Sequence, residues 1–242
     1  TGMQQSRHEV ADVALYESSF LKCFDRFYGK IMNYCILALL PSYLSRQSSS
    51  LIYMADKLIT ESKHDQSGFY LDASGALLDA LEKLKKNGQP TILLGVSFAL
   101  LDIADHNTID FPGLIVMETG GMKGRRKEMI REELHGRLCN AFGVPVIHSE
   151  YGMTELLSQA YSQRSGIYHA PPWMKIMIRD INDPLTLIGH HQTGGINIID
   201  LANMHSCSFV ASQDLGKSYP DGSFEVLGRF DDSDVRGCNL MV

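Results

Sequence analysis

The sequence predicts an α/β fold: a parallel or mixed sheet with flanking helices, followed by a smaller β-rich subdomain. Short apolar runs alternate with amphipathic helical segments between residues 74 and 148, which is the pattern of a parallel sheet covered by helices. After about Gly166 the chain changes to short strand-like segments separated by Gly, Pro, Asn and Asp. The 242 residues, of which 44% are hydrophobic, are enough to bury a sizeable core.

The first long segment, residues 9 to about 39, is predicted to be helical because apolar residues recur at steps of three and four without a proline. Residues 36–40 are apolar but stop at Pro41. We interpret them as core, because a membrane span needs a run of about 18 apolar residues. Pro41 and the serines at 48–50 separate this segment from the next element.

The alternating part of the chain supplies the predicted sheet and its helices. Its elements are expected at the following positions: a helix over 74–86, strands over 91–96 and 113–117, a helix over about 126–142, and a third strand over 144–148. The first helix carries a leucine stripe and the second ends at Gly143, as helix periodicity and C-terminal glycine signals suggest. The apolar runs are typical of buried parallel strands.

The β-rich part is predicted from turn residues that bound short alternating runs. Its strands are expected over 175–179, 195–199, 207–211 and 223–227. The chain is therefore divided into an α/β subdomain over residues 1–165, a β-rich subdomain over 166–228 and a hinge-like C-terminal stub over 229–242.

Charge and cysteine content limit the possible functions. The formal net charge of −6 argues against a nucleic-acid partner, because phosphate binding needs clustered Lys and Arg. The five cysteines are odd in number and scattered without a CxxC pair, which indicates a reducing cytoplasm better than a disulfide framework or a zinc site. The sequence contains neither a membrane-spanning run nor a signal-peptide pattern, so we expect a cytoplasmic protein.

The third predicted strand leads into Tyr151-Gly152-Met153-Thr154-Glu155. Ligands bind at the carboxyl ends of strands in α/β sheets. An aromatic ring there can stack on a base, a threonine hydroxyl can bind a phosphate oxygen, and a carboxylate can hold Mg²⁺. The same residues are compatible with a strand end and a following helix, capped by Thr154 with Glu155 in its first turn. The pentapeptide alone leaves both interpretations open.

This segment resembles the Tyr-Gly-x-Thr-Glu motif of the adenylate-forming superfamily of acyl-CoA synthetases, luciferases and related ligases. Three further segments resemble motifs of that superfamily and occur in its order. They are Glu118-Thr119-Gly120-Gly121, Ser212-Gln213-Asp214-Leu215-Gly216 and Gly228-Arg229-Phe230-Asp231-Asp232. The resemblance implies the fold of the large N-terminal domain of these enzymes, with ATP and Mg²⁺ as the groups that the site binds.

The resemblance also implies a role for each matched residue. In the superfamily these positions bind ATP and its metal. By this resemblance Tyr151 would stack on adenine, with Gly120, Gly121 and Gly152 beside it, and Thr154 would contact the α-phosphate. Glu155 would bind Mg²⁺, Asp214 would bind the ribose hydroxyls, and Arg229 would contact ribose or phosphate.

Thr1-Gly2 resembles the end of the superfamily's phosphate-binding loop, with Ser6-Arg7 close behind. We expect the chain to begin inside that loop, whose backbone N–H groups cradle phosphates, with the N-terminal part of the family's domain missing from it. An ordinary N-terminal segment is the alternative interpretation.

The last residues resemble those of the acyl-protein synthetases, the long-chain-fatty-acid–luciferin-component ligases and their homologues, which finish on a Gly-Cys segment. Residues 118–125 also resemble that branch. The resemblance implies ATP-dependent activation of a fatty acid to acyl-AMP and transfer to the thiol of Cys238, with an acyl-accepting reductase as a partner. As an alternative, Cys238 is a small apolar residue of a C-terminal strand.

Two other functions remain open for the chain. One is that of an acyl- or aryl-CoA ligase relative without the C-terminal lid and its catalytic lysine, and the other is that of a nucleotide-binding fragment without turnover. His148, just before the motif, is interpreted either as part of an acyl site or as a strand-end histidine bonded to backbone.

Overall fold

The computed structural model describes residues 7–41, 49–70, 75–120 and 129–230. Its helices are α1 (Val13–Tyr28), α2 (Ser50–Ser62), α3 (Gly75–Lys86), α4 (Ser97–Ala104) and α5 (Arg131–Phe142), with short 3-10 helices η1 (Ile31–Asn33) and η2 (Leu201–Asn203). In the described part of the chain, no helix is both long and apolar enough to cross a membrane.

The strands form one continuous sheet in the order β2-β1-β3-β4-β5-β6-β7-β12-β11-β10-β8-β9. Their bounds are β1 (Cys35–Leu39), β2 (Gly68–Phe69), β3 (Thr91–Val96), β4 (Leu114–Thr119), β5 (His148–Tyr151), β6 (Ala160–Ser162), β7 (Ile167–His169), β8 (Met174–Arg179), β9 (Leu187–Ile188), β10 (Thr193–Asp200), β11 (Phe209–Ser218) and β12 (Phe224–Arg229).

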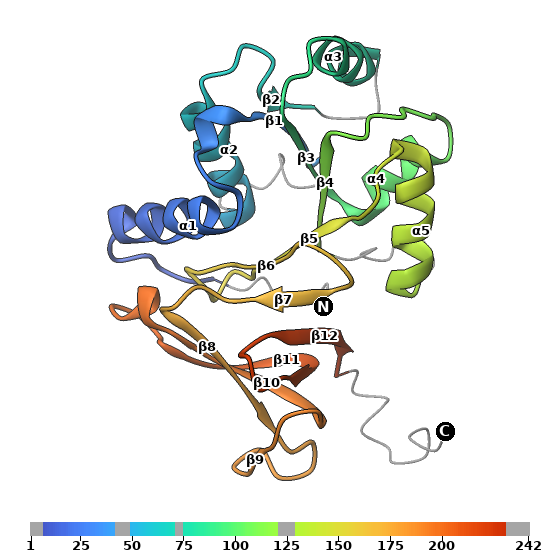
Figure 1. Cartoon of the computed structure of the whole chain (residues 1–242). Helices are drawn as coiled ribbons and strands as arrows, with labels where there is room; N and C mark the ends of the chain where they lie inside the picture. The colour runs from blue at the N-terminus through green and yellow to red at the C-terminus, as the bar shows by residue number, and fades with distance from the viewer. Residues whose placement is uncertain (1–6, 42–48, 71–74, 121–128, 231–242) are drawn as a thin grey trace.

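The N-terminal half is a parallel sheet with helices on both faces. Strands β1 to β5 pair in parallel, β1 with β2 and β3, β3 with β4, and β4 with β5. Helices α1 and α2 lie on one side of these strands and α4 and α5 on the other (Figure 1). Every residue of β1 and β3 is buried, as expected for strands covered on both faces.

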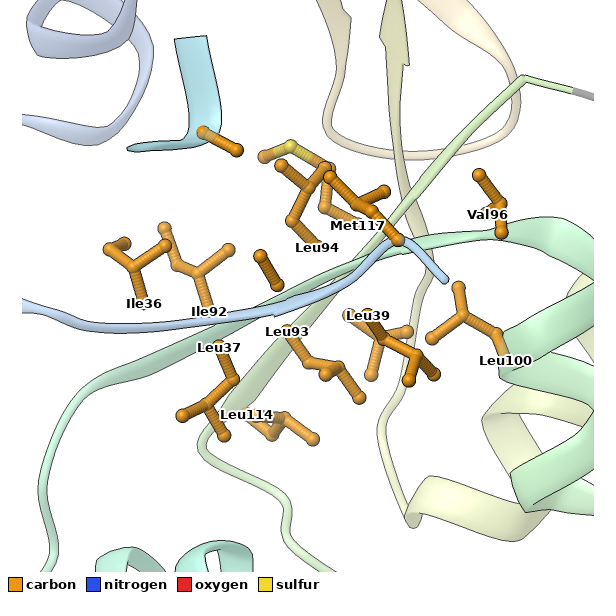
Figure 2. Packing of buried hydrophobic residues seen from close by; sticks show 14 of the residues in the cluster. Ile36, Leu37, Leu39, Ile92, Leu93, Leu94, Val96, Leu100, Leu114 and Met117 are labelled. Carbon is orange, nitrogen blue, oxygen red and sulfur yellow. The ribbon is translucent and has the colours of Figure 1, made fainter. Parts of the chain in front are cut away.

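Alternate side chains of the central strands fill the two halves of the core (Figure 2). Ile36, Ile92 and Leu94 point to one face of the sheet, whereas Leu37 and Leu93 point to the other, because successive side chains of a strand alternate. All five are at most 2% exposed.

The C-terminal half is antiparallel. β5 pairs antiparallel with β6, and every later strand pair in the sheet is also antiparallel. Tyr168, Phe224 and Ile196 belong to a second hydrophobic cluster, separate from the one around β1 and β3. The domain boundaries at residues 165 and 228 stay predictions, since the sheet continues from one half into the other.

Two predicted elements were wrong in type or position. Residues 35–39 form strand β1 and not the end of a long helix, because helix α1 already ends before Gly29. Periodicity does not distinguish a short buried strand from a buried helical segment. The third strand covers His148–Tyr151 and not residues 144–148; Pro145, which has no backbone N–H, lies before it.

Leu93→Ala tests how far the stability of the fold depends on the central strands. Leu93 is 0% exposed, so the substitution leaves a cavity and should lower the free energy of unfolding by about 2–5 kcal/mol. Urea unfolding followed by circular dichroism measures this change. Leu185→Ala is the matched control: Leu185 is 92% exposed, and its loss should change stability by less than about 0.5 kcal/mol. Equal effects of the two changes would contradict the burial of β3.

Candidate functional site

Three of the residues to which the resemblance assigns a role in ATP binding lie close together, on β5, β11 and β12. Tyr151, the last residue of β5, donates its hydroxyl to Asp214 Oδ2 at 2.8 Å. Arg229 Nε lies 3.4 Å from Asp214 Oδ1. Asp214 and Arg229 are directly opposite each other in the β11–β12 ladder. The sheet thus brings together residues that are far apart in the sequence.

Tyr151 is packed firmly into the second hydrophobic cluster. Its ring contacts Tyr168 and Phe224 edge to face, with centroids 5.9 and 5.7 Å away, and the residue is 8% exposed. Burial, together with the neighbouring Asp214 carboxylate, raises the pKa of Tyr151 far above its usual value. The hydroxyl therefore keeps its proton and acts as a donor. The adenine stack implied by the resemblance stays a prediction.

Arg229 offers a positive charge at the rim of this site. Its side chain is 59% exposed, compared with 14% for Asp214, and Nη2 donates to Gln213 Oε1 at 3.3 Å. An exposed ion pair of this kind adds little stability. Because more than half of its side chain is exposed, the guanidinium can also contact an anionic ligand.

Gly120 follows β4 at the neighbouring strand end. Its φ of +66° lies in the left-handed region, which glycine adopts without steric cost. Ser97 Oγ lies 2.9 Å from the Gly120 carbonyl oxygen and 3.0 Å from Glu118 Oε2. These contacts hold the end of β4 in place. Gly121 lies outside the described residues.

No helix follows Tyr151. The chain turns through residues 152–159 and returns as the antiparallel strand β6, so a helix capped by Thr154 is wrong. A carboxylate from the other half of the molecule organises this turn: buried Asp200 accepts hydrogen bonds from Leu157 N at 2.8 Å and from Ser158 N at 3.0 Å. Asn203 Nδ2 donates to the Glu155 carbonyl oxygen at 2.7 Å.

Asp200 and Asn203 could not be identified from the sequence. Neither belongs to a motif, and their partners lie 43 and 48 residues earlier in the chain. No local pattern signals such contacts, so only the fold shows them.

A cavity of about 120 Å³ lies beside the motif and is lined by Gly152, Thr154, Glu150 and Gln159 together with residues of α1 and α2. A Cβ at Gly152 would lie 2.5 Å from Glu150 Oε1. Only glycine therefore fits between these groups without a shift of the carboxyl. Glu150 and Gln159 were not identified from the sequence either.

A larger and more open hollow, of about 300 Å³, runs along α5. It is lined by Arg131, His135 and Cys139, among others, and by none of the motif residues. We therefore place the candidate site at the strand ends and not in this hollow.

Besides Tyr151, two titratable groups of β5 have shifted pKa values, the buried Glu150 and the half-buried His148. Burial raises the pKa of Glu150 to about 7, although Thr119 Oγ1 donates to its Oε2 at 2.5 Å. Burial lowers the pKa of His148 to about 4. Its Nδ1 lies 3.2 Å from the Tyr28 hydroxyl oxygen, so its described partner is a side chain and not backbone.

Several predicted site residues fall outside the part of the chain that the structure describes. They are Thr1, Gly2, Gly121 and Cys238, together with residues 231–242 of the C-terminal stub. Glu155 is described and half-buried. Within the described ranges no three His, Cys, Asp or Glu side chains gather as a metal cluster. Mg²⁺ does not require one, because it is commonly held by one or two carboxylates, waters and substrate phosphates.

No protein-family model matches this sequence, and no curated protein matches it. Solved structures match it at low identity. Apo MatB from Rhodopseudomonas palustris aligns with a TM-score of 0.67 at 16% identity, over 96% of this chain and 47% of that one. Amide bond synthetase McbA from Marinactinospora thermotolerans gives 0.61 at 14% identity, over 90% and 45%. Coronafacic acid ligase from Pectobacterium brasiliense gives 0.51 at 21% identity, over 81% and 39%.

These matches show a shared fold. The predicted α/β architecture, a large mixed sheet flanked by helices, is confirmed and is shared with these solved structures. The chain spans less than half the length of the three solved structures named above.

The two titratable groups on β5 predict opposite pH dependences. The pKa of Glu150 is raised from 4.5 to about 7, so the stability linked to its protonated form is present below pH 4.5 and lost as pH rises through 7. Relative to the unchanged protein, Glu150→Gln should gain roughly 3 kcal/mol of unfolding free energy between pH 4.5 and 7. Urea unfolding at several pH values measures it. If the unfolding free energies of the two proteins change with pH in parallel, the raised pKa of the buried Glu150 carboxyl is contradicted.

His148 provides the opposite sign for the same measurement. Its pKa is lowered from 6.5 to about 4, so the stability linked to its neutral form is present above pH 6.5 and lost as pH falls toward 4. His148→Gln should therefore become more stable, relative to the unchanged protein, as the solution is acidified over that range. If the difference in stability between the two proteins does not grow on acidification, the lowered pKa of His148 is contradicted.

Proposed function

We propose that this chain is the nucleotide-binding part of an enzyme that uses ATP to convert a carboxylic acid into an acyl-adenylate. The observation that carries this proposal is the linked set Tyr151–Asp214–Arg229, which joins the ends of β5 and β12 to the middle of β11 and follows the order of the superfamily's motifs. One of the solved structures that share the fold is described as ATP-bound MatB.

In this proposal Asp214 accepts hydrogen bonds from the ribose hydroxyls. The Tyr151 hydroxyl fixes its orientation through Oδ2, and charge-assisted hydrogen bonds to hydroxyls are stronger than neutral ones. Gly120, with no side chain in the way at the end of β4, lies along the adenine. Arg229 reaches from the exposed side toward ribose or phosphate.

Glu155 is the residue that would hold Mg²⁺. It supplies carboxylate oxygens, the ligand type that Mg²⁺ prefers, and its backbone is fixed by Asn203. When bound, the metal would neutralise charge on the phosphates.

The transfer of the adenylyl group to the carboxylate needs no added proton donor. An oxygen of the substrate carboxylate forms a bond to the α-phosphorus of ATP, and the bond from that phosphorus to the bridging oxygen of the β-phosphate breaks. Pyrophosphate leaves with the electron pair. Thr154 donates a hydrogen bond to a non-bridging oxygen of the α-phosphate, and Arg229 offsets charge that builds up there.

The resemblance to acyl-protein synthetases supports a finer proposal, in which the acid is a fatty acid and the acceptor is Cys238. The cysteine thiolate then forms a bond to the acyl carbonyl carbon, the bond from that carbon to AMP breaks, and a thioester remains. An acyl-accepting reductase would be the partner that removes the acyl group.

ATP–pyrophosphate exchange in the complete protein tests the first step. Exchange should depend on an added carboxylic acid, and Asp214→Asn should raise the KM for ATP roughly 10- to 100-fold, since a charged acceptor for the ribose is lost. Asp221→Asn, in the exposed turn between β11 and β12, is the matched control and should leave KM unchanged. ATP binding without acid-dependent exchange would favour a nucleotide-binding protein without turnover.

The acceptor is tested separately by labelling. Labelled fatty acid and ATP should leave a label on the protein that hydroxylamine removes, and Cys238→Ala should abolish it. Cys207→Ala serves as the control, because Cys207 is an exposed cysteine away from the motif. A label that survives the change at Cys238 would remove this residue from the mechanism, and thioester formation on added CoA would favour a CoA ligase.

A further inference from the structure

Strand β11 carries a bulge at the residue to which ribose binding is assigned. On either side of the bulge β10 and β11 pair through Gly195–Leu215 and Asn197–Ala211. Residues 212–214 of β11 therefore lie opposite the single residue Ile196 of β10, and Asp214 is one of the three. Bulges are common beside active sites, where they change the direction of a side chain and interrupt the ladder of backbone hydrogen bonds.

The guanidinium of Arg179, the last residue of β8, donates hydrogen bonds to this bulge. Nη1 donates to the Ile196 carbonyl oxygen at 2.9 Å and to Asn197 Oδ1 at 2.8 Å, and Nη2 donates to the Ser212 carbonyl oxygen at 2.6 Å. One side chain thus bridges β10 and β11 where their ladder is interrupted. Because hydrogen bonds from a charged donor are stronger than neutral ones, the guanidinium holds the backbone of the bulge.

The Ser212 hydroxyl extends this contact to Asp214. Its Oγ donates to the Ile196 carbonyl oxygen at 3.1 Å and accepts from Asp214 N at 3.2 Å. Ser212 is buried, and its single proton fixes the direction of both bonds, since a carbonyl only accepts and an N–H only donates. Arg179 is therefore connected to Asp214 through Ile196 and Ser212.

A glycine leaves the space for this guanidinium. A Cβ on Gly195 would lie 2.7 Å from Arg179 Nε, which is closer than a Cβ approaches other atoms in proteins. Its described hydrogen-bond partners are uncharged oxygens, and partial burial lowers the pKa of the guanidinium. Desolvation of a charge is unfavourable, and ionisable groups in such environments are concentrated at functional sites.

The same guanidinium also contacts the end of β12. Arg179 Cζ lies 5.5 Å from the centre of the Phe230 ring, a distance at which a cation is attracted to the face of an aromatic ring. Phe230 follows Arg229, and its N–H donates to the Gln213 carbonyl oxygen at 2.7 Å. Arg179 therefore supports the two chain segments that carry Asp214 and Arg229.

We propose that Arg179 is a positioning residue for nucleotide binding: it holds the bulge of residues 212–214 in one conformation, so that Asp214 keeps the orientation in which it accepts from the ribose hydroxyls. This role rests on the proposed function, which assigns the ribose to Asp214. Without the guanidinium, the carbonyl oxygens of Ile196 and Ser212 lose a charged donor, and the backbone of the bulge relaxes. The carboxylate of Asp214 then no longer faces the ribose hydroxyls.

Nucleotide binding followed by titration calorimetry tests this role in the complete protein. The probes are ATP, 2′-deoxy-ATP and 3′-deoxy-ATP, each with Mg²⁺. The unchanged protein should bind ATP about 10- to 100-fold more tightly than either deoxynucleotide, the range for a hydrogen bond to a charged acceptor. Arg179→Met keeps the length of the side chain but removes its donors, and should lower this preference about 10-fold. Loss of affinity by the same factor for all three nucleotides would overturn the proposal.

A double-mutant cycle shows whether Arg179 acts through Asp214. Asp214→Asn alone should reduce the preference for ATP, because the charged acceptor is lost. Arg179→Met added to it should change the preference by less than about 2-fold, since residues that act through one contact are not additive. Additive effects of the two changes would contradict the connection.

Two further variants separate this role from a folding defect. Ser212→Ala removes the hydroxyl between Asp214 N and the Ile196 carbonyl oxygen, and should lower the preference for ATP about 3-fold, as expected for a neutral hydrogen bond. Arg137→Met on α5, whose side chain is 41% exposed, is the matched control and should leave the preference unchanged. If Arg179→Met does not fold, a Ser212→Ala protein with the full preference overturns the proposal.

The binding result is distinguishable from failure of adenylation. The predicted change in nucleotide preference, in a protein that shows no acid-dependent pyrophosphate exchange, would support the role of Arg179 and contradict the proposed chemistry. If the unchanged protein binds no ATP, or binds all three nucleotides equally, the assignment of the ribose to Asp214 is wrong, and the role of Arg179 is wrong with it.

Discussion

The turn between β5 and β6 carries Gly152, Thr154 and Glu155, yet no helix holds its backbone. Hydrogen bonds to the carboxylate of Asp200 hold it instead. Asp200 is fully buried, accepts from Leu157 N and Ser158 N, and also accepts from the Ser158 hydroxyl at 2.6 Å. A buried carboxylate without such donors would be costly, so the turn and the end of β10 stabilise each other. The geometry of the candidate site depends on this contact between the two halves of the chain.

Neighbouring residues of β5 face different parts of the molecule, the second hydrophobic cluster and the small cavity beside Gly152. Successive residues of a strand point to opposite faces: Tyr151 packs into the second hydrophobic cluster and binds Asp214, while Glu150 lines the cavity with residues of α1 and α2. Gly152, the next residue, keeps the space beside Glu150 open, because a Cβ there would lie 2.5 Å from Glu150 Oε1.

The cavity also shows where the fold gives up stability. Glu150 is buried with a raised pKa, and Gln159 Oε1 is buried without a partner. Each is unfavourable in the free protein, because burial removes water without supplying full compensation. Such groups concentrate at functional sites. In β1 and β3, by contrast, the buried side chains are apolar except that of Thr91, whose hydroxyl donates to the Gln89 carbonyl oxygen at 2.8 Å, and the strand backbones are paired.

The sequence by itself determined the fold class, the helix predicted over residues 74–86 and the strand over 91–96. These depend on local periodicity, which is carried by residues close together in the chain. It did not determine that residues 35–39 form a strand, since a short buried run satisfies either period. Nor did it identify Asp200, Glu150 or Gln159. Their roles come from partners that lie far away in sequence or from the shape of a cavity, and only the tertiary structure, by pairing β5 with β6 and β10 with β11, brings those groups together.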